Sequence, residues 1–228
     1  MRQSAGVARV RKVKSRGLFI SFEGIEGSGK TTQLSHAAEL LRRQGIPVVT
    51  TREPGGTALG LQLRRLLLEL AEPMDATTEL LMMFADRRQH IVEGILPALE
   101  AGKVVLCDRF TDASRAYQGG GRKLGEEAVD LLHERFCGLE PDRTYLLDCP
   151  VDVAMARVAA RLGGDRDRIE REDDQFHERV RAAYRRRARK EPGRIHVVDA
   201  TRDPDQICAE VMEDLERLVA PFRPKNRE

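Results

Sequence analysis

The sequence contains no tryptophan, and its seven phenylalanines and three tyrosines leave few aromatic side chains for any binding site. It also lacks an apolar run long enough to span a membrane, and its N-terminal stretch has no apolar segment of the kind found in secretion signals. The four cysteines are too scattered for a metal site, and Cys107 and Cys149 fall in or beside predicted strands. We therefore expect reduced core thiols in a cytoplasmic protein without a membrane partner.

Excess positive charge is confined to the N-terminus. The chain has 39 basic and 37 acidic residues, but six basic and no acidic residues lie in residues 1–16. The remainder is mildly acidic, which argues against a broad basic face for nucleic acid. With 41% hydrophobic residues, the length favours one α/β domain over residues 17–220. We expect a disordered arm over residues 1–16 and a flexible tail over residues 221–228.

A phosphate-binding motif is the most specific feature of the chain. Residues 24–31 read GIEGSGKT and match G-x-x-x-x-G-K-S/T, between a predicted strand (17–22) and a predicted helix (31–44). Glycines let consecutive backbone N–H groups face one anion, and the helix N-terminus adds its positive dipole. Lys30 is then expected to reach the β- and γ-phosphates, and the Thr31 hydroxyl to bind Mg²⁺. The motif predicts binding of a nucleoside triphosphate.

Short strand-like runs alternate with helical ones along the chain. The predicted strands cover residues 17–22, 46–51, 103–107, 143–148 and 194–199, and longer helices include residues 77–100, 125–136, 151–161 and 203–219. This alternation predicts a five-stranded parallel sheet with helices on both faces. Ligands bind such sheets beyond the carboxyl ends of the strands, where Gly24, Arg52, Asp108 and Asp199 fall.

Two arginines indicate an anionic second substrate. Asp108 ends an apolar strand, as an acid that holds Mg²⁺ does, and Arg109 follows it directly. Arg52 lies in TREPGGT at the end of the second strand. A guanidinium matches phosphate bidentately, so two of them at neighbouring strand ends predict a phosphate between them. An ion pair at the strand end, or a solvated loop charge, is the simpler alternative.

Residues for a base are found on two later segments. Phe84 and Arg88 are four residues apart on the predicted helix 77–100, a spacing that suits stacking on a flat base and bonding its edge. Ser114 and Gln118 are also four residues apart and precede three glycines. They are expected to contact the base or the sugar. Alternatively, Phe84 fills the core and the glycine-rich segment is a flexible surface loop.

A charged segment with glycines, residues 161–172, predicts a mobile lid. Phosphoryl transfer needs positive charge around the transferring group and exclusion of water, and a closing loop with Arg161, Arg166 and Arg168 would supply both. A solvated run of charges is the alternative. The later run of residues 185–187, three arginines, is interpreted as the solvated face of a helix.

Taken in order, GIEGSGKTT, TREPGG, the strand-end DRF, AYQGGGR, DRIE and VDAT resemble the thymidylate kinase family of bacteria, over about residues 18–218. The resemblance implies a P-loop kinase fold and the reaction ATP + dTMP → ADP + dTDP. It further implies Mg²⁺ as the cofactor and a cytoplasmic homodimer. DRF stands where the family has DRY or DRH, and Asp86 and Arg87 stand where small residues are usual.

The resemblance also implies roles for individual residues. The catalytic residues would be Lys30, Arg109 and the lid arginines Arg161, Arg166 and Arg168. The metal would be held by Thr31 and Asp108. ATP would be bound by Glu26, Gly27, Ser28, Gly29, Lys30, Thr31, Thr32, Ala200 and Thr201. The dTMP would be bound by Glu26, Arg52, Phe84, Arg88, Arg109, Ser114, Tyr117 and Gln118, with Tyr117 beneath the deoxyribose.

Two other functions are kept as alternatives. A kinase for another nucleotide or for a nucleoside is one; a nucleoside acceptor would need a carboxylate base, for which Glu23 and Glu53 are candidates. An ATP-driven switch whose basic arm contacts nucleic acid is the other.

Overall fold

Five parallel strands form the centre of the computed structural model, which describes residues 17–70, 72–162 and 166–223. Their order across the sheet is β2-β3-β1-β4-β5, and every neighbouring pair is parallel. The predicted five-stranded parallel sheet is therefore confirmed. The strands are β1 (Leu18–Glu23), β2 (Val48–Arg52), β3 (Val104–Asp108), β4 (Arg143–Asp148) and β5 (Ile195–Asp199).

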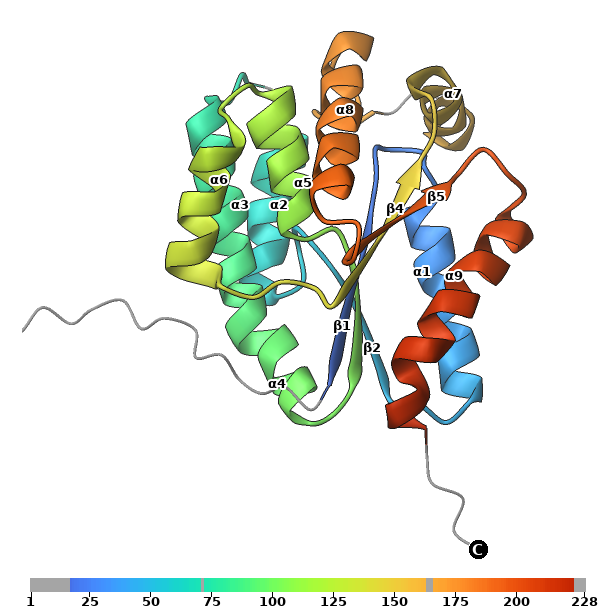
Figure 1. The fold of residues 1–228 in the computed structure, drawn as a ribbon. Coiled ribbons are helices and arrows are strands. Elements are labelled where there is room, and N and C mark those ends of the chain that lie inside the picture. Colours follow the sequence, from blue (N-terminus) through green and yellow to red (C-terminus); the bar gives the residue numbers. More distant parts are fainter. Residues whose placement is uncertain (1–16, 71, 163–165, 224–228) are drawn as a thin grey trace, which may run out of the picture.

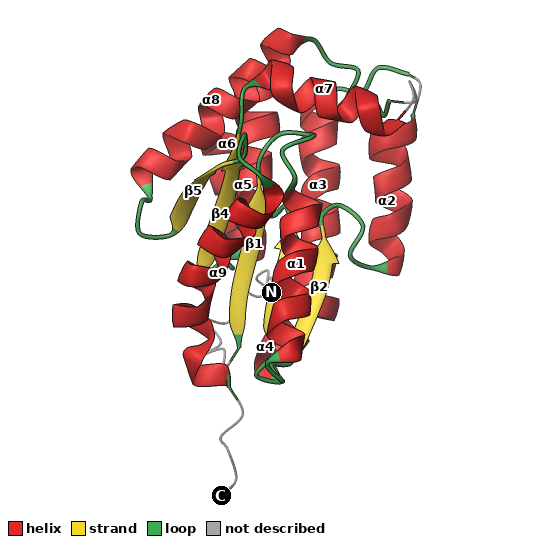
Figure 2. Ribbon diagram, turned by 90° about the vertical axis from the view of Figure 1, so that its right-hand side faces the viewer, coloured by secondary structure: helices red, strands yellow, loops and turns green. Residues whose placement is uncertain are grey.

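Helices cover both faces of this sheet (Figure 1). The helices α1 and α9 pack together on one face, while α3, α4 and α6 lie on the other. Figure 2 shows α7 crossing the molecule beyond the carboxyl ends of the strands. The helices are α1 (Lys30–Arg43), α2 (Ala58–Glu69), α3 (Ala76–His90), α4 (Leu96–Glu100), α5 (Thr111–Ser114), α6 (Glu126–Leu132), α7 (Val151–Leu162), α8 (Asp174–Lys190) and α9 (Pro204–Val219).

Within the described residues, three helical segments are wound as π-helices, which the sequence pattern did not predict. They are η1 (Ile91–Ile95), η2 (Arg115–Gly121) and η3 (His133–Cys137). The glycines of η2 belong to a helix rather than to a surface loop, and α8 packs closely against Gly120 and Gly121. A Cβ atom on Gly121 would lie 2.7 Å from the ring of Phe176 on α8. These glycines therefore serve the close approach of two helices.

The core has two parts, one on each side of the sheet. Successive residues of a strand face opposite sides, so Phe19 joins the cluster with α3 and α4, while Ile20 and Phe22 join the cluster with α1, α8 and α9. Both sides are covered, which explains why every residue of β1 and the first four of β3 are buried. All four cysteines are free, and three of them, Cys107, Cys137 and Cys149, are buried. No helix in the described part of the chain is long and apolar enough to cross a membrane.

The predicted terminal segments are only partly described. The arm, residues 1–16, lies outside the described residues, as do residues 163–165 of the predicted lid and 224–228 of the tail. The expected start of the tail at residue 221 is corrected, because the short helix η4 (Ala220–Phe222) follows α9 and Phe222 packs against the core.

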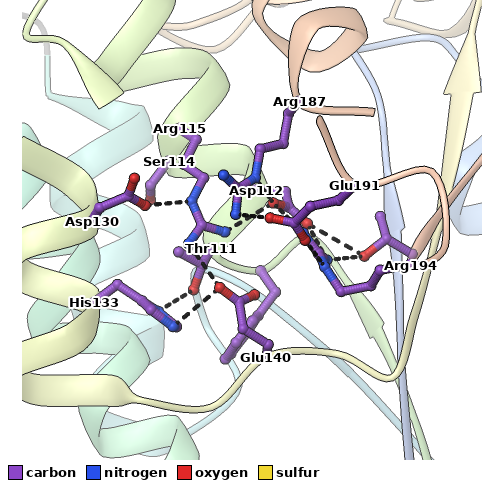
Figure 3. Close-up of polar contacts among 12 residues, drawn as sticks. Thr111, Asp112, Ser114, Arg115, Asp130, His133, Glu140, Arg187, Glu191 and Arg194 are labelled. Carbon is purple, nitrogen blue, oxygen red and sulfur yellow. Dashed lines mark hydrogen bonds and ion pairs between the residues drawn. The ribbon is translucent and has the colours of Figure 1, made fainter. Parts of the chain in front are cut away.

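A buried carboxylate joins α5, α8 and the loop before β5. Figure 3 shows Asp112 among Arg115, Arg187 and Arg194. Arg194 donates to both of its oxygens, at 2.7 and 3.0 Å, and Arg115 donates at 3.0 Å. Burial alone raises the pKa of Asp112, but hydrogen bonding and charge from Arg194, with the charges of Arg115 and Arg187, outweigh it and lower the pKa to about 2. Arg187 is thus largely buried, which corrects the expectation that residues 185–187 are all solvated; Arg185 and Arg186 are exposed.

Candidate active site

A cavity of about 680 Å³ opens beyond the carboxyl ends of the strands. Its walls come from the loop after β1, the ends of β2 and β3, the helices α2, α3 and α7, the segment η2, the predicted lid and the loop after β5. This volume is within the range of small-molecule sites. Predicted site residues that line it are Glu26, Gly27, Ser28, Gly29, Lys30, Thr31, Thr32, Arg52, Asp108, Arg109, Tyr117, Gln118, Arg161, Arg168 and Ala200.

The phosphate loop, residues 24–31, has the backbone conformation that an anion-binding site needs. Gly27 has φ of 74°, and a Cβ atom there would lie 2.1 Å from the carbonyl oxygen of Ala154. Lys30 is buried, and its Nζ donates to the carbonyl oxygen of Ile25 at 2.8 Å. Burial, followed by the charge of Arg109, lowers the pKa of Lys30 to about 8. A polyphosphate would offset both effects and favour the ammonium form.

Two oxygen ligands meet beside this loop. The Thr31 hydroxyl, on the first turn of α1, donates to Oδ2 of Asp108 at 2.6 Å. Hydroxyl and carboxylate oxygens suit Mg²⁺, which keeps several waters and is completed by substrate phosphates. In the described residues, no cluster of three or more His, Cys, Asp or Glu side chains could hold a metal alone. The pair therefore fits an ion that arrives with the nucleotide.

Arg109 is held in an unusual backbone conformation above the loop. Its φ is 72°, in the left-handed region that few non-glycine residues adopt. Its guanidinium donates to Glu26 at 2.7 Å and to the carbonyl oxygen of Gly24 at 2.9 Å, and lies 4.8 Å from the centre of the Tyr117 ring. Tyr117 donates its hydroxyl to the other Glu26 oxygen at 2.7 Å. Although burial raises the pKa of Glu26, Arg109 and Lys30 outweigh it and keep the carboxyl ionised.

A fully buried carboxyl, Glu23, is linked to Arg109 through Tyr184. Its oxygens accept from the backbone N–H of Phe110 at 2.6 Å and from the Tyr184 hydroxyl at 2.8 Å, and Tyr184 also accepts from Arg109 at 3.3 Å. Burial, followed by the charge of Asp112, raises the pKa of Glu23 to about 8. Sequence reasoning considered Glu23 only as a base for a nucleoside acceptor. Its burial and these contacts make it a support for Arg109.

Glu53, the other candidate base, is also engaged. Its carboxylate accepts from Arg87 at 2.7 Å and pairs with His90 at 2.9 Å, and all three side chains are buried. Neither Glu23 nor Glu53 is available to take a proton from a hydroxyl. The structure therefore gives no support to a nucleoside acceptor.

Positive charge converges at the end of β2. Arg52 lines the cavity as predicted, and Arg64 of α2 lines it as well, donating to the carbonyl oxygen of Pro54 at 3.0 Å. Burial and then the charge of Arg52 lower the pKa of Arg64, so the two arginines repel one another and an anion between them would relieve that repulsion. Arg64 was missed because a single arginine in a leucine-rich helix carries no motif.

Phe84 and Arg88 do not reach the cavity, which corrects their assignment to the base. Phe84 is buried in the core cluster on the α3 side, and Arg88 donates to the carbonyl oxygen of Phe136, at 3.0 Å. Side chains one residue apart diverge by about 100° around a helix. Met83 lines the cavity at this part of α3, and Arg87 is buried.

Ser114 is likewise corrected. It is fully buried, does not line the cavity and accepts from Nη1 of Arg87 at 3.0 Å. Arg87 also donates to Glu53 and to the carbonyl oxygen of Phe110, at 3.0 Å to the latter. Ser114 thus positions Arg87 from η2's N-terminal side. Gln118, one turn later, does line the cavity.

The lid arginines have different surroundings. Arg161 lines the cavity, is exposed and pairs with Glu170 at 2.8 Å. Arg168 lines it too, but donates to the carbonyl oxygen of Leu67 at 2.8 Å and to Glu79 at 2.6 Å. Arg166 does not line the cavity, so two of the three predicted lid arginines, Arg161 and Arg168, do so here.

At the opposite end, the loop after β5 contributes Ala200, as predicted. Arg157 of α7 donates to its carbonyl oxygen at 2.9 Å. Thr201 is exposed and folds back onto Asp199 through its backbone and hydroxyl groups, at 2.9 and 2.7 Å, so it does not line the cavity.

Comparison with known proteins places these features in one family. The family model described as thymidylate kinase matches residues 22–211. The chain belongs to the thymidylate kinase family. Members of this family phosphorylate dTMP to dTDP with ATP as the donor, which is the reaction that the resemblance implied.

Individual thymidylate kinases agree over nearly the whole chain. The thymidylate kinase of Bordetella pertussis is 50% identical over 206 residues, which is 90% of this chain and 97% of that protein. That of Ectopseudomonas mendocina is 51% identical over 205 residues, 89% of this chain and 95% of that protein. The crystal structure of the Ehrlichia chaffeensis enzyme has a TM-score of 0.71 and 38% identity, covering 88% of this chain and 98% of that one.

The place of Met83 in the lining of the cavity leads to a prediction about base binding. Met83→Ala should raise KM for dTMP about tenfold, since it removes roughly 1–2 kcal/mol of apolar contact. Arg88→Ala, whose guanidinium reaches Phe136 instead, should leave this KM unchanged. Steady-state kinetics at saturating ATP measure both. A raised KM in Arg88→Ala with an ordinary one in Met83→Ala would restore the original assignment.

Proposed function

We propose that this thymidylate kinase transfers the γ-phosphoryl group of ATP to the phosphate of dTMP within the 680 Å³ cavity, giving ADP and dTDP. The observation that carries the proposal is the meeting of two anion sites in one cavity. The phosphate loop forms one, and Arg109 with Arg52 and Arg64 forms the other. Two phosphate groups repel one another, so a phosphate acceptor needs such a concentration of positive charge.

The donor side uses the phosphate loop. Its backbone N–H groups and Lys30 hold the phosphates of ATP, and Lys30 exchanges its bond to the Ile25 carbonyl for one to phosphate. Thr31 and Asp108 would hold Mg²⁺, which neutralises charge on the β- and γ-phosphates. Ala200 and the neighbouring loop after β5 form the wall for the adenine.

The acceptor side depends on Arg109. Its guanidinium now pairs with Glu26, and it offers the fork that a phosphate monoester accepts. Tyr117, fixed by its bond to Glu26, presents its ring as the floor for the deoxyribose. Met83 and Gln118 form the wall for thymine. Because dTMP is already ionised, the acceptor needs no general base.

The lid supplies charge to the transferring group. Arg161 and Arg168 line the cavity from the lid, and Arg161 is the better placed because it is exposed and, among the described residues, bonds to Glu170 alone. Arg168 is held by Leu67 and Glu79. We propose that Arg161 stabilises the transition state and that Arg168 holds the lid against α2 and α3.

A coupled ADP-release assay tests the function. With Mg·ATP, the enzyme is offered dTMP, dUMP, dCMP, dGMP and thymidine in parallel. Fastest turnover with dTMP is expected. Fastest turnover with thymidine would reinstate a nucleoside acceptor, and release that ignores every acceptor but rises with DNA or RNA would favour the ATP-driven switch.

A homodimer in the cytoplasm is the proposed state of the enzyme. Exposed leucines mark the outer side of two neighbouring helices: Leu59 and Leu66, two turns apart on α2, are both 50% exposed, and Leu81 on α3 is 53% exposed. Apolar surface of this kind marks protein interfaces. The four free thiols are consistent with a reducing compartment.

The dimer gives a second prediction. Leu81→Asp should convert the dimer into a monomer, because a buried unpaired carboxylate at an interface costs several kcal/mol. Val197→Asp, similarly exposed but on the edge strand β5, is the matched control and should stay dimeric. Sedimentation velocity measures the mass of each. If both variants are dimers, the interface lies elsewhere on the protein. If the wild-type enzyme is a monomer, the proposed homodimer is wrong.

A further inference from the structure

Gln118 has a buried side-chain amide whose NH₂ group is hydrogen-bonded but whose oxygen is not. Its Nε2 donates to Oε1 of Glu79 at 2.7 Å. Its Oε1 is buried and has no hydrogen-bond partner, although the residue lines the cavity beside Tyr117. Buried acceptors without a partner are uncommon, and one at the wall of a binding cavity calls for a donor from the ligand.

The orientation of this amide is dictated by Glu79. A carboxylate only accepts hydrogen bonds, so the NH₂ group of Gln118 must face it and the carbonyl must face away. Glu79 is 1% exposed on α3 and also accepts from Arg168 at 2.6 Å and pairs with Arg122 at 3.1 Å. Burial raises the pKa of Glu79, but the Gln118 hydrogen bond and Arg122 outweigh it and lower the pKa. The carboxylate therefore stays ionised, and the amide cannot turn over.

A fixed acceptor distinguishes the pyrimidine bases by chemistry. N3 of thymine or uracil carries a hydrogen and donates, whereas N3 of neutral cytosine carries none and accepts. Opposite the Gln118 carbonyl, cytosine would leave two acceptors facing each other. A site built around a hydrogen-bonded group rejects a ligand that cannot complete the bond.

We propose that Glu79 is a positioning residue that sets the base preference of this enzyme: it fixes the Gln118 carbonyl as an acceptor for N3–H and so selects imide bases against cytosine. The proposal rests on the proposed function, in which Gln118 forms the wall for thymine. Arg122 and Arg168 take part only by keeping the Glu79 carboxylate ionised.

The test is the ratio of kcat/KM for dTMP to that for dCMP. In Glu79→Gln, residue 79 can donate as well as accept, so the Gln118 amide can turn and offer its NH₂ group to the base. We expect this ratio to fall by roughly 10- to 100-fold. Glu172→Gln is the matched control, because Glu172 pairs with the same arginine, Arg122, at 2.6 Å but does not bond to Gln118. Its ratio should equal that of the wild type.

A third variant separates the possible failures. Gln118→Leu should also lose the preference for dTMP. If it does and Glu79→Gln keeps the wild-type ratio, the role of Glu79 is wrong while the base contact stands. If Gln118→Leu keeps the wild-type ratio, the base contact is wrong and the proposal falls with it. No turnover of dTMP by the wild type would instead overturn the proposed function.

A chemical probe covers the case in which Glu79→Gln does not fold. N3-methyl-dTMP lacks the N3 hydrogen, and the wild-type enzyme should use it at least about tenfold less efficiently than dTMP. In Gln118→Leu this difference should shrink. Equal use of the two nucleotides by the wild type would overturn the proposal without any substitution at Glu79.

Discussion

Arg109→Ala is expected to lower kcat/KM for dTMP by roughly 10²- to 10³-fold, which is the cost of removing one preorganised donor to a developing charge. The guanidinium donates to Glu26 and to the Gly24 carbonyl at the edge of the cavity, and its removal leaves the Glu26 carboxylate without its closest positive partner. The phosphate of dTMP would then meet uncompensated negative charge. Steady-state kinetics with each substrate varied in turn measure the loss.

The same variant should bind ADP nearly as well as the wild type, since the phosphate loop and Lys30 are untouched. Isothermal titration with ADP checks this. Arg109→Lys is the informative companion, because it keeps the charge but loses the planar fork, and we expect it to recover only part of the activity. An Arg109→Ala enzyme with ordinary kcat and KM for dTMP would remove Arg109 from the acceptor site.

The largest effect on stability is expected for Asp112→Asn. Asp112 is 2% exposed and neutralises Arg194 and Arg115, so its loss leaves buried positive charge unpaired. Breaking a buried ion pair in this way costs about 3–5 kcal/mol of unfolding free energy. Asp130→Asn is the matched control: Asp130 also pairs with Arg115, but its side chain is 37% exposed, so we expect a cost below about 1 kcal/mol. Urea unfolding at pH 7 measures both.

The pH dependence of stability follows from the same pair of arginines. The fold lowers the pKa of Asp112 from 3.8 to about 2, so its stabilisation is complete above pH 4 and is lost as the pH falls towards 2. About two pKa units correspond to roughly 2–3 kcal/mol. The wild type should therefore lose more stability than Asp112→Asn between pH 5 and pH 3. Parallel losses in the two proteins would contradict the assignment.

The sequence predicted which residues lie beside the cavity at the ends of strands. The phosphate loop, Arg52, Asp108 and Arg109 are placed by the strand before them, and parallel strands bring their carboxyl ends to one edge. The position of a strand end does not depend on knowing which face of a helix a residue occupies. The five-stranded sheet followed from the same alternation of strand and helix.

The helical part of the site could not be predicted as well, because α3 buries polar side chains. Glu79, Asp86, Arg87 and His90 all face inwards, so apolarity does not mark the inner side of this helix. With two arginines in succession, a spacing of four residues fits Phe84 with Arg88 and Met83 with Arg87 equally well. Only the packing of Phe84 into the core decides between them. The roles of Ser114 and Glu79 depend on contacts between distant segments and leave no local pattern.

The phosphate loop and the arginines Arg52, Arg64 and Arg109 line one undivided cavity, so one inhibitor molecule can reach both groups. A single molecule that carries a thymidine at one end and an adenosine at the other, joined by a chain of phosphates, would occupy both halves at once. Its second end would bind at a high effective concentration once the first is in place, so its affinity should exceed that of either nucleotide alone. The best length of the phosphate chain would then measure the span between the two nucleosides during transfer.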